Sequence, residues 1–172
     1  MRKLVLLAST IVAVVAAIAL PTRAVATTAT FTLTAGALSI SAPSSSVAIG
    51  APQVASTSAR TFSGPLGTVT VTDERGGSTT WVASVISTAF TPVPASTAVA
   101  AVNVAYAAGT VTASALVTTA TPVTTDLTGV SPVVNGTSTG ISTASWNPTI
   151  TVVVPANAAP GVYSGTITHS VA

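Results

Sequence analysis

The sequence contains no cysteine, which excludes disulfide bonds and thiolate metal sites. Charge is nearly as scarce, since only 5% of the 172 residues are Asp, Glu, Lys or Arg. With one histidine and three acidic residues, no convincing Ser-His-Asp triad or pair of catalytic carboxylates can be assembled. A histidine-based metal site lacks further ligands. We therefore expect a non-catalytic protein without a cofactor or a metal ion.

The N-terminus has the pattern of a secretory signal peptide. Arg2 and Lys3 are followed by the apolar run Leu4–Leu20, and an A-x-A cleavage site ends at Ala26. The rival interpretation is an uncleaved membrane anchor, but the 17 residues of the run are at the low end for crossing a bilayer. We predict cleavage after Ala26 and secretion, with no membrane contact afterwards.

Removing residues 1–26 from 172 leaves 146 residues, the size of one domain. The charged residues that remain are Arg60, Arg75, Asp73, Glu74 and Asp126. Two arginines against three carboxylates give a net charge of −1, so the basic balance of the precursor belongs to its leader. Nucleic-acid binding needs clustered Lys and Arg, and two scattered arginines exclude it. We expect residues 27–172 to form a single domain.

The rest of the chain is rich in Ala, Val, Thr and Ser. Ser and Thr richness is also typical of glycosylated stalks and disordered segments. Disordered chains, however, are poor in β-branched residues and rich in charge, which is the reverse of this composition. Thr and Val suit a pleated, half-buried surface. The composition therefore predicts a folded β protein.

The clearest pattern lies in the middle of the chain. Thr68–Asp73 alternates hydroxyl and apolar residues, and Trp81–Ile86 alternates again. Between them Gly76 and Gly77 can adopt the positive φ values of a tight turn. Two alternating runs joined by such a turn predict a β-hairpin.

Other short runs predict further strands. They lie at 29–35, 37–42, 47–50, 60–63, 99–107, 110–117, 149–154 and 162–171, the fifth and sixth forming a second hairpin. The stretch 122–145 has little pattern and is expected to be loops around one or two short strands. The total of about nine or ten short strands predicts an all-β, Ig-like antiparallel β-sandwich.

Two segments resemble the WxL domain of Gram-positive surface proteins. The first is Gly-Thr-Val-Thr-Val-Thr-Asp-x-Arg-Gly from Gly67, followed by Trp81-Val82-Ala83. The second is Val-Pro, five residues, then Gly-x-Tyr-x-Gly-Thr-Ile-Thr before His169 and Val171. Ala83 and Val171 stand where the family has Leu, and His169 stands where it has Trp. The resemblance implies a WxL-like β-sandwich that attaches non-covalently to peptidoglycan, with Trp81, Val82, Ala83, His169 and Val171 as the wall-binding positions.

Several side chains have competing interpretations. Trp81 either stacks on a sugar ring or packs into the core, and the core is preferred because large aromatics usually serve it. Trp146 is expected to find a partner for its indole N–H. His169, on an apolar strand face, is expected to be hydrogen-bonded and partly buried. Asp73 and Arg75 are expected to form an exposed ion pair of little energy.

The sequence predicts a secreted, non-catalytic protein of the cell-wall surface. No Leu-Pro-x-Thr-Gly sorting motif occurs, so attachment without a covalent link is expected. The expected partners are peptidoglycan or another wall component, other surface proteins, or further copies of the chain. The alternative function is a structural or adhesive subunit that associates through sheet edges, because low charge leaves those edges unguarded.

Overall fold

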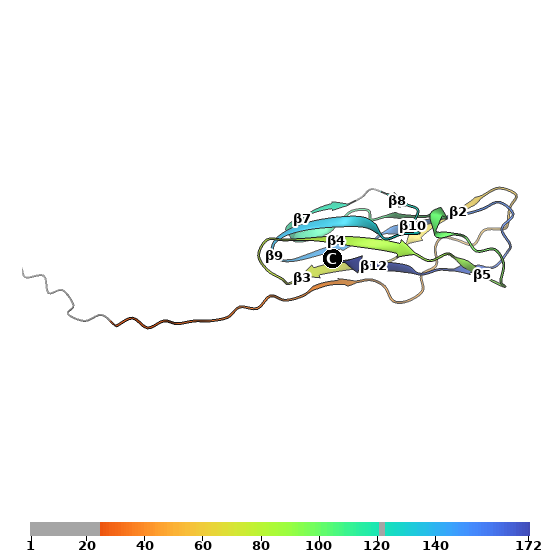
Figure 1. The fold of residues 1–172 in the computed structure, drawn as a ribbon. Coiled ribbons are helices and arrows are strands. Elements are labelled where there is room, and N and C mark those ends of the chain that lie inside the picture. The colour runs from red at the N-terminus through yellow and green to blue at the C-terminus, as the bar shows by residue number, and fades with distance from the viewer. Residues whose placement is uncertain (1–24, 121–122) are drawn as a thin grey trace, which may run out of the picture. The chain divides into compact units, whose positions relative to one another are not determined.

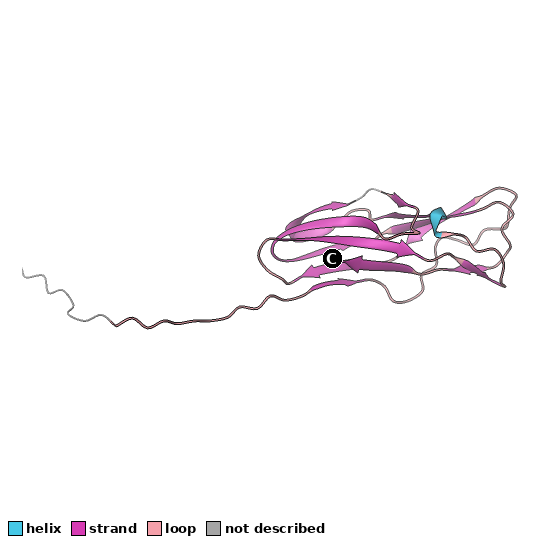
Figure 2. Ribbon diagram, in the orientation of Figure 1, coloured by secondary structure: helices cyan, strands magenta, loops and turns pink. Residues whose placement is uncertain are grey.

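The computed structural model describes residues 25–120 and 123–172, with 115–120 described by their backbone alone. Residues 1–24, nearly all of the predicted leader, lie outside the described part. Residues 34–172 form one compact unit, which holds all the strands that the structure describes. The unit is an all-β sandwich of antiparallel sheets, which confirms the predicted fold class (Figure 1, Figure 2).

The elements follow the chain in this order. They are β1 (Leu38–Ser41), β2 (Arg60–Pro65), β3 (Val69–Asp73), β4 (Thr79–Ser87), β5 (Thr91–Val93), the 3-10 helix η1 (Ala101–Asn103), β6 (Val104–Ala107), β7 (Thr112–Ala120), β8 (Thr124–Thr125), β9 (Ser131–Trp146), β10 (Thr149–Val154), β11 (Val162–Ser164) and β12 (Ile167–Val171). One sheet has the order β1-β3-β9-β4-β12 with β7 also paired to β9, another the order β2-β10-β6-β8, and β5 and β11 form a ribbon.

The register joins these pieces into two layers. In the first layer β2 and β3 follow one another along β10 and the end of β9, with Phe62 opposite Val152 and Asp73 opposite Ser142. In the second layer β4 and β5 run along β12 and β11, with Ala83 opposite Val171. In each layer, successive short strands therefore pair along the same neighbouring strands, with short breaks between them.

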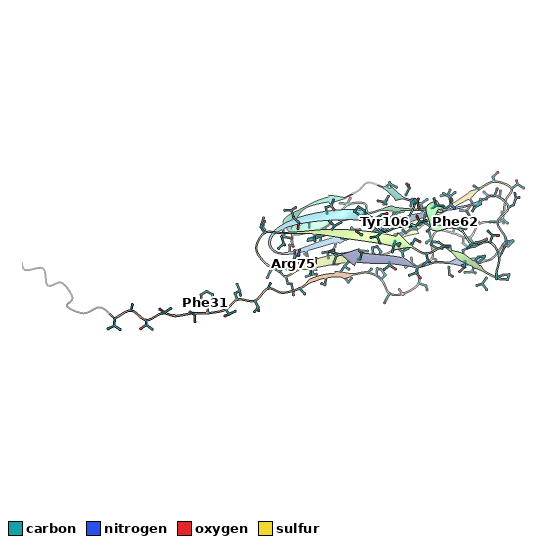
Figure 3. All side chains as sticks on the ribbon, viewed as in Figure 1. Phe31, Phe62, Arg75 and Tyr106 are labelled. Carbon is teal, nitrogen blue, oxygen red and sulfur yellow. The ribbon has the colours of Figure 1, made fainter. Side chains whose placement is uncertain are left out.

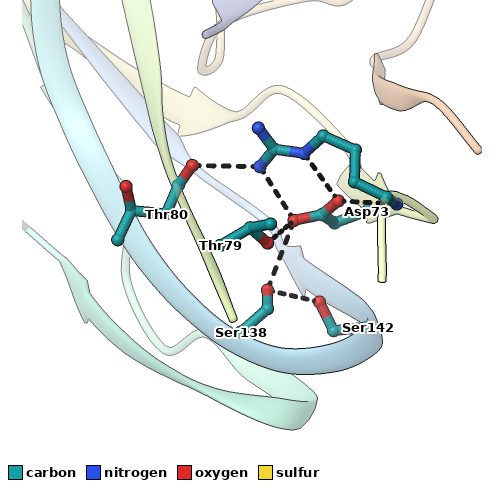
Figure 4. A network of polar contacts seen from close by, with 6 residues as sticks. Asp73, Thr79, Thr80, Ser138 and Ser142 are labelled. Carbon is teal, nitrogen blue, oxygen red and sulfur yellow. Dashed lines mark hydrogen bonds and ion pairs between the residues drawn. The ribbon is translucent and has the colours of Figure 1, made fainter. Parts of the chain in front are cut away.

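Strand β9 passes from one layer to the other. Its first half pairs with β4 and its last residues pair with β3. The hydroxyl oxygens of Ser138 and Ser142 lie 2.8 Å apart, although four residues of extended strand would separate them by about 13 Å. The strand thus bends sharply at 139–141, and Figure 4 shows its ribbon turning there. We call this region, where β3 also passes into β4, the closed end.

The core lies between the two layers. The inward residues of the central strands are almost fully buried, in the alternation that a half-buried strand requires. The core consists of Val69, Val71, Trp81, Ala83, Val85, Phe90, Val99, Val104, Tyr106, Ala108, Leu127, Val133, Val134, Ala144, Trp146, Ile150 and Val152. Strand β10 confirms the predicted strand at 149–154 and buries Ile150 and Val152 on one face.

Both predicted hairpins are wrong. The segments 68–73 and 81–86 are strands, but β9 lies between them in the sheet order. Gly76 and Gly77 do have positive φ values, of 71° and 68°, yet their turn carries the chain between layers. Long-range pairing with β9 buries the inward faces of both strands, which a local hairpin of two strands would leave exposed.

The predicted pair 99–107 and 110–117 fails for the same reason. Strand β6 pairs with β10 and β8, whereas β7 pairs with β9. The chain does reverse between the two runs, at a turn that contains Gly109 with a φ of 71°. A turn signal therefore located the reversal of the chain without identifying the strands that pair.

Three other expectations are wrong. Residues 29–35 and 47–50 form no strand, and none of the described strands pairs with them. The stretch expected to be mainly loop contains β9, which spans 16 residues. Its Ser, Thr and Gly residues carry little apolar pattern, yet they pair with strands on both sides.

Candidate functional site

The structure brings the two motif segments together. Ala83 in β4 lies opposite Val171 in β12, although 88 positions separate them in the sequence. Beyond that pair, Val82 and Ala172 exchange two backbone hydrogen bonds of 2.8 and 3.1 Å. The residues that the resemblance singled out thus form one antiparallel patch on the second layer.

Trp81 and Ala83 point into the core from this patch. Trp81 is 1% exposed and Ala83 is fully buried, so neither presents a surface to a ligand. A Cβ atom on Gly136 would approach the indole ring within 2.2 Å, which shows how closely the ring covers this glycine. The indole Nε1 is buried without a hydrogen-bond partner among the described residues. Trp81 therefore serves packing.

Val82 is the motif residue that faces outward, with 38% of its surface exposed. It lies opposite Asn135 of β9, and Thr80 lies opposite Thr137. Ser170 of β12 is exposed on the same side of the layer. We call Thr80, Val82, Asn135, Thr137 and Ser170 the outer face. It is uncharged and rich in hydroxyl groups.

His169 and Val171 are half-buried between the layers. The Nε1 of Trp146 donates to the hydroxyl of Tyr106 at 2.8 Å, and that hydroxyl lies 3.1 Å from Nε2 of His169. Because the indole only donates, the tyrosine proton is free to point at His169, which then accepts through Nε2 as a neutral ring. The expected partners of Trp146 and His169 are thereby confirmed.

Burial shifts the pKa values of the two titratable groups in this hydrogen-bonded series, Tyr106 and His169. Desolvation lowers the pKa of His169 below its ordinary 6.5. Desolvation also raises the pKa of Tyr106 to about 12, against a smaller opposing effect of the bond from Trp146. Both groups are therefore neutral at physiological pH, and the chain holds the two layers together without charge.

A groove of about 870 Å³ opens beside His169. One wall is the loop 42–52, and the other is the run 161–167 of β11 and β12. Phe62, Leu66, Phe90, Val152, Val154 and Ile167 supply apolar surface. Among the described residues, no Asp, Glu, Lys or Arg lines it. We call this region of the sandwich the open end, and Figure 3 shows Phe62 there and Arg75 at the opposite end.

The closed end holds a polar cluster centred on Asp73. Arg75 donates to both carboxylate oxygens at 2.9 Å, and the hydroxyls of Thr79 and Ser138 donate to Oδ2 at 2.8 and 3.4 Å (Figure 4). Asp73 is fully buried while Arg75 keeps 31% of its side-chain surface, so the expectation of an exposed pair of little energy is wrong. The hydrogen bonds from Arg75 hold the pKa of Asp73 well below its usual range.

This cluster braces the bend in β9. Ser138 and Ser142 flank the bend and hydrogen-bond each other, and Ser138 also donates to Asp73. Arg75 reaches across to the carbonyl of Thr80 at 2.9 Å. The hydrogen bonds around the carboxylate therefore link β3, β4 and β9 at the closed end.

The described residues contain no group of three or more metal-ligating side chains. Within the same residues, no helix is long and apolar enough to span a bilayer. No family model, curated protein or solved structure matches the chain. The outer face and the groove are therefore the candidate binding surfaces of the described residues.

Sequence reasoning missed both the groove and the bend. The groove is lined by residues from five separate stretches of the chain, so no local sequence motif predicts it. The bend had a weak signal, since Gly140 lies in a polar run between two Ser residues that prove to be buried, Ser138 and Ser142. Buried serines in an apolar protein indicate a satisfied polar cluster.

Proposed function

We propose that the protein is a secreted, non-catalytic module of the Gram-positive cell surface that attaches non-covalently to peptidoglycan through the outer face. The observation that carries the proposal is the pairing of the two WxL-like segments in one patch, with Val82 exposed at its centre. The leader supports secretion, and the resemblance supports the wall as the partner.

The chemistry of the outer face suits a glycan strand. Hydroxyl and amide side chains can exchange hydrogen bonds with sugar hydroxyls, and Val82 adds an apolar contact for the faces of the rings. The absence of charged groups from the outer face avoids a desolvation cost on binding. Trp81 supports this surface from beneath through its contact with Gly136, the inward neighbour of Asn135 and Thr137.

Co-sedimentation with purified peptidoglycan sacculi tests the proposal. The variant Val82→Glu places a charge in the outer face, and Val153→Glu is its matched control, because Val153 is also 38% exposed but lies on β10 of the other layer. We expect the wild type and Val153→Glu to sediment with the walls. Val82→Glu should bind at least about tenfold more weakly, as one lost set of contacts in a small interface would produce.

Two results would reject wall attachment through the outer face. The first is a wild-type protein that stays in the supernatant at every sacculus concentration. The second is equal loss of binding in the two glutamate variants, which would show that charge anywhere on the surface prevents sedimentation. Circular dichroism of both variants checks that each is folded.

A second candidate function is a self-associating surface subunit. One observation favours it independently of the wall, namely the exposure of Phe31 and Leu33, at 93% and 90% of their surfaces.

A further inference from the structure

The segment 29–35 has the pattern of a strand but pairs with none of the strands that the structure describes. Ala29, Phe31, Leu33 and Ala35 share one phase and three threonines occupy the other. Phe31 and Leu33 are the most exposed of the large hydrophobic residues that the structure describes. Both lie just after the predicted cleavage site at Ala26, close to the new N-terminus. An apolar strand face of this kind requires a surface to cover it.

Strand β12 has β1 close to part of its outer edge but hydrogen-bonds there to no strand that the structure describes, and this free edge borders the groove at Ile167 and His169. Val82 and Ala172 exchange two backbone bonds, so the even-numbered residues of β12 face β4. In an antiparallel ladder the alternate residues point the other way, and the backbone N–H and C=O groups of Ile167 and His169 are therefore directed away from β4. The sheet order ends at β12 within the described residues. No lysine guards this edge, because the only lysine of the chain is Lys3 in the leader.

The groove lies along this same edge. The side chain of Ile167 faces into it, together with Phe62 and Phe90. A strand added to β12 at Ile167 and His169 would therefore direct one of its two faces into an uncharged, apolar groove. The face that carries Phe31 and Leu33 is complementary to it in polarity and in the spacing of alternate residues.

The segment cannot reach the groove of its own molecule. The backbone N–H of Gly36 donates to the carbonyl of Glu74 at 3.0 Å, which fixes the start of β1 at the closed end. Phe31 precedes Gly36 by five residues, a span of at most about 18 Å. Leu66, at the near side of the groove, hydrogen-bonds Pro148, and the six residues from Ser142 to Pro148 cover roughly 20 Å.

The far side of the groove is more distant still. Phe62 pairs with Val152, ten residues of strand from Ser142, which is roughly 33 Å from the closed end. A segment that folded back from Gly36 would also use residues to reverse its direction. Phe31 therefore fits only the groove of another molecule.

We propose that residues 29–35 of one copy add to the free edge of β12 in a second copy and insert Phe31 and Leu33 into its groove. The donor segment leaves the domain at the closed end, while the acceptor groove is at the open end. The contact is therefore heterologous and joins copies head to tail into open-ended chains. Main-chain bonds supply the pairing, as in other complexes formed by strand addition. This association is independent of wall attachment.

Sedimentation velocity of residues 27–172 over a wide range of concentration tests the proposal. We expect species that grow beyond the dimer as concentration rises. The double variant Phe31→Asp and Leu33→Asp should stay monomeric, because its charges would enter the groove. The control Thr30→Asp and Thr32→Asp carries the same charges on the opposite face and should associate as the wild type does. A monomeric wild type, or an equal effect of the two double variants, would overturn the proposal.

The monomeric double variant also provides an acceptor with an empty groove. A fluorescent peptide of residues 27–36 should bind it saturably, while a peptide with Phe31→Asp and Leu33→Asp should bind at least tenfold more weakly. Equal binding of the two peptides would contradict insertion of Phe31 and Leu33. Sacculus binding of the same variant is measured separately, so failure of self-association and failure of wall attachment give different results.

Discussion

The two ends of the sandwich differ in polarity: the closed end buries a polar cluster, and the open end has an apolar groove. At the closed end the chain crosses between layers, and the polar groups that this buries are gathered around Asp73. At the open end the layers separate around an uncharged groove beside a free strand edge. A protein without disulfides can thus fix one end of a sandwich with hydrogen bonds to a buried carboxylate and leave the other end available to a partner.

The largest expected effect comes from breaking the closed end. Asp73→Ala removes the shared acceptor of Arg75, Thr79 and Ser138, and a hydrogen bond to a charged group typically contributes about 1.5–3 kcal/mol. Urea unfolding of residues 27–172 measures the loss. Glu74→Ala, at an exposed neighbouring carboxylate, should change the free energy of unfolding by less than about 0.5 kcal/mol. A similar cost for both variants would show that the cluster does not brace the closed end.

A smaller loss of stability is expected from breaking the hydrogen bonds between Trp146, Tyr106 and His169 near the groove. Tyr106→Phe removes the acceptor of Trp146 and the donor to His169, and leaving buried polar groups unpaired costs about 1–3 kcal/mol. Tyr163→Phe is the matched control, because its hydroxyl donates to the backbone of Ala159 in a half-buried position. The control should cost less than Tyr106→Phe in the same unfolding measurement. The reverse order would contradict the role of Tyr106.

Acidification should weaken the two ends in sequence. His169 has a lowered pKa in the folded state, so below about pH 6.5 the unfolded chain binds the proton more readily and stability falls. Asp73 also has a lowered pKa, so its contribution is lost only as the pH drops below its ordinary 3.8. Urea unfolding from pH 8 to pH 3 should show both phases, and His169→Gln should abolish the first alone. A variant with an unchanged first phase would assign that phase to another group.

The smallest effect concerns the turn at the closed end. Gly76 has a φ of 71°, and no atom lies within 4 Å of an added Cβ, so Gly76→Ala tests backbone strain without a clash. An L-residue in this region costs about 1–2 kcal/mol. Gly140→Ala also meets nothing within 4 Å, and it has no positive φ. It should therefore cost less than Gly76→Ala, and equal thermal shifts would argue against strain at Gly76.

The sequence predicted the fold class and most strands, because alternation of apolar and polar residues records which face of a strand is buried. It located the turns at Gly76 and Gly109 correctly and paired the strands wrongly. Pairing depends on which distant strand completes a sheet, and this information is not local. Strand β9 was missed because its buried residues include Ser138, Ser142 and Gly136, which carry no apolar signal.

The site residues were predictable in part. An aromatic residue in phase with Ala83 and Val85 indicated that Trp81 lies in the core. The apolar face around His169 indicated a hydrogen-bonded, partly buried histidine. The burial of Asp73 was not predictable, since its burial depends on the bend in β9, 65 positions later in the sequence. The segment 29–35 has the alternation of a strand, and we propose that it pairs with β12 of another copy.

Hydrogen exchange at low and high protein concentration tests the contrast between the two ends most directly. We predict that the amides of Ile167, His169 and residues 29–35 exchange quickly in dilute solution and become protected at high concentration. The amides of β3 and the last residues of β9, at the closed end, should be protected equally at both concentrations. Unchanged exchange at Ile167 and His169 across the range would contradict an open end that receives a strand from another copy.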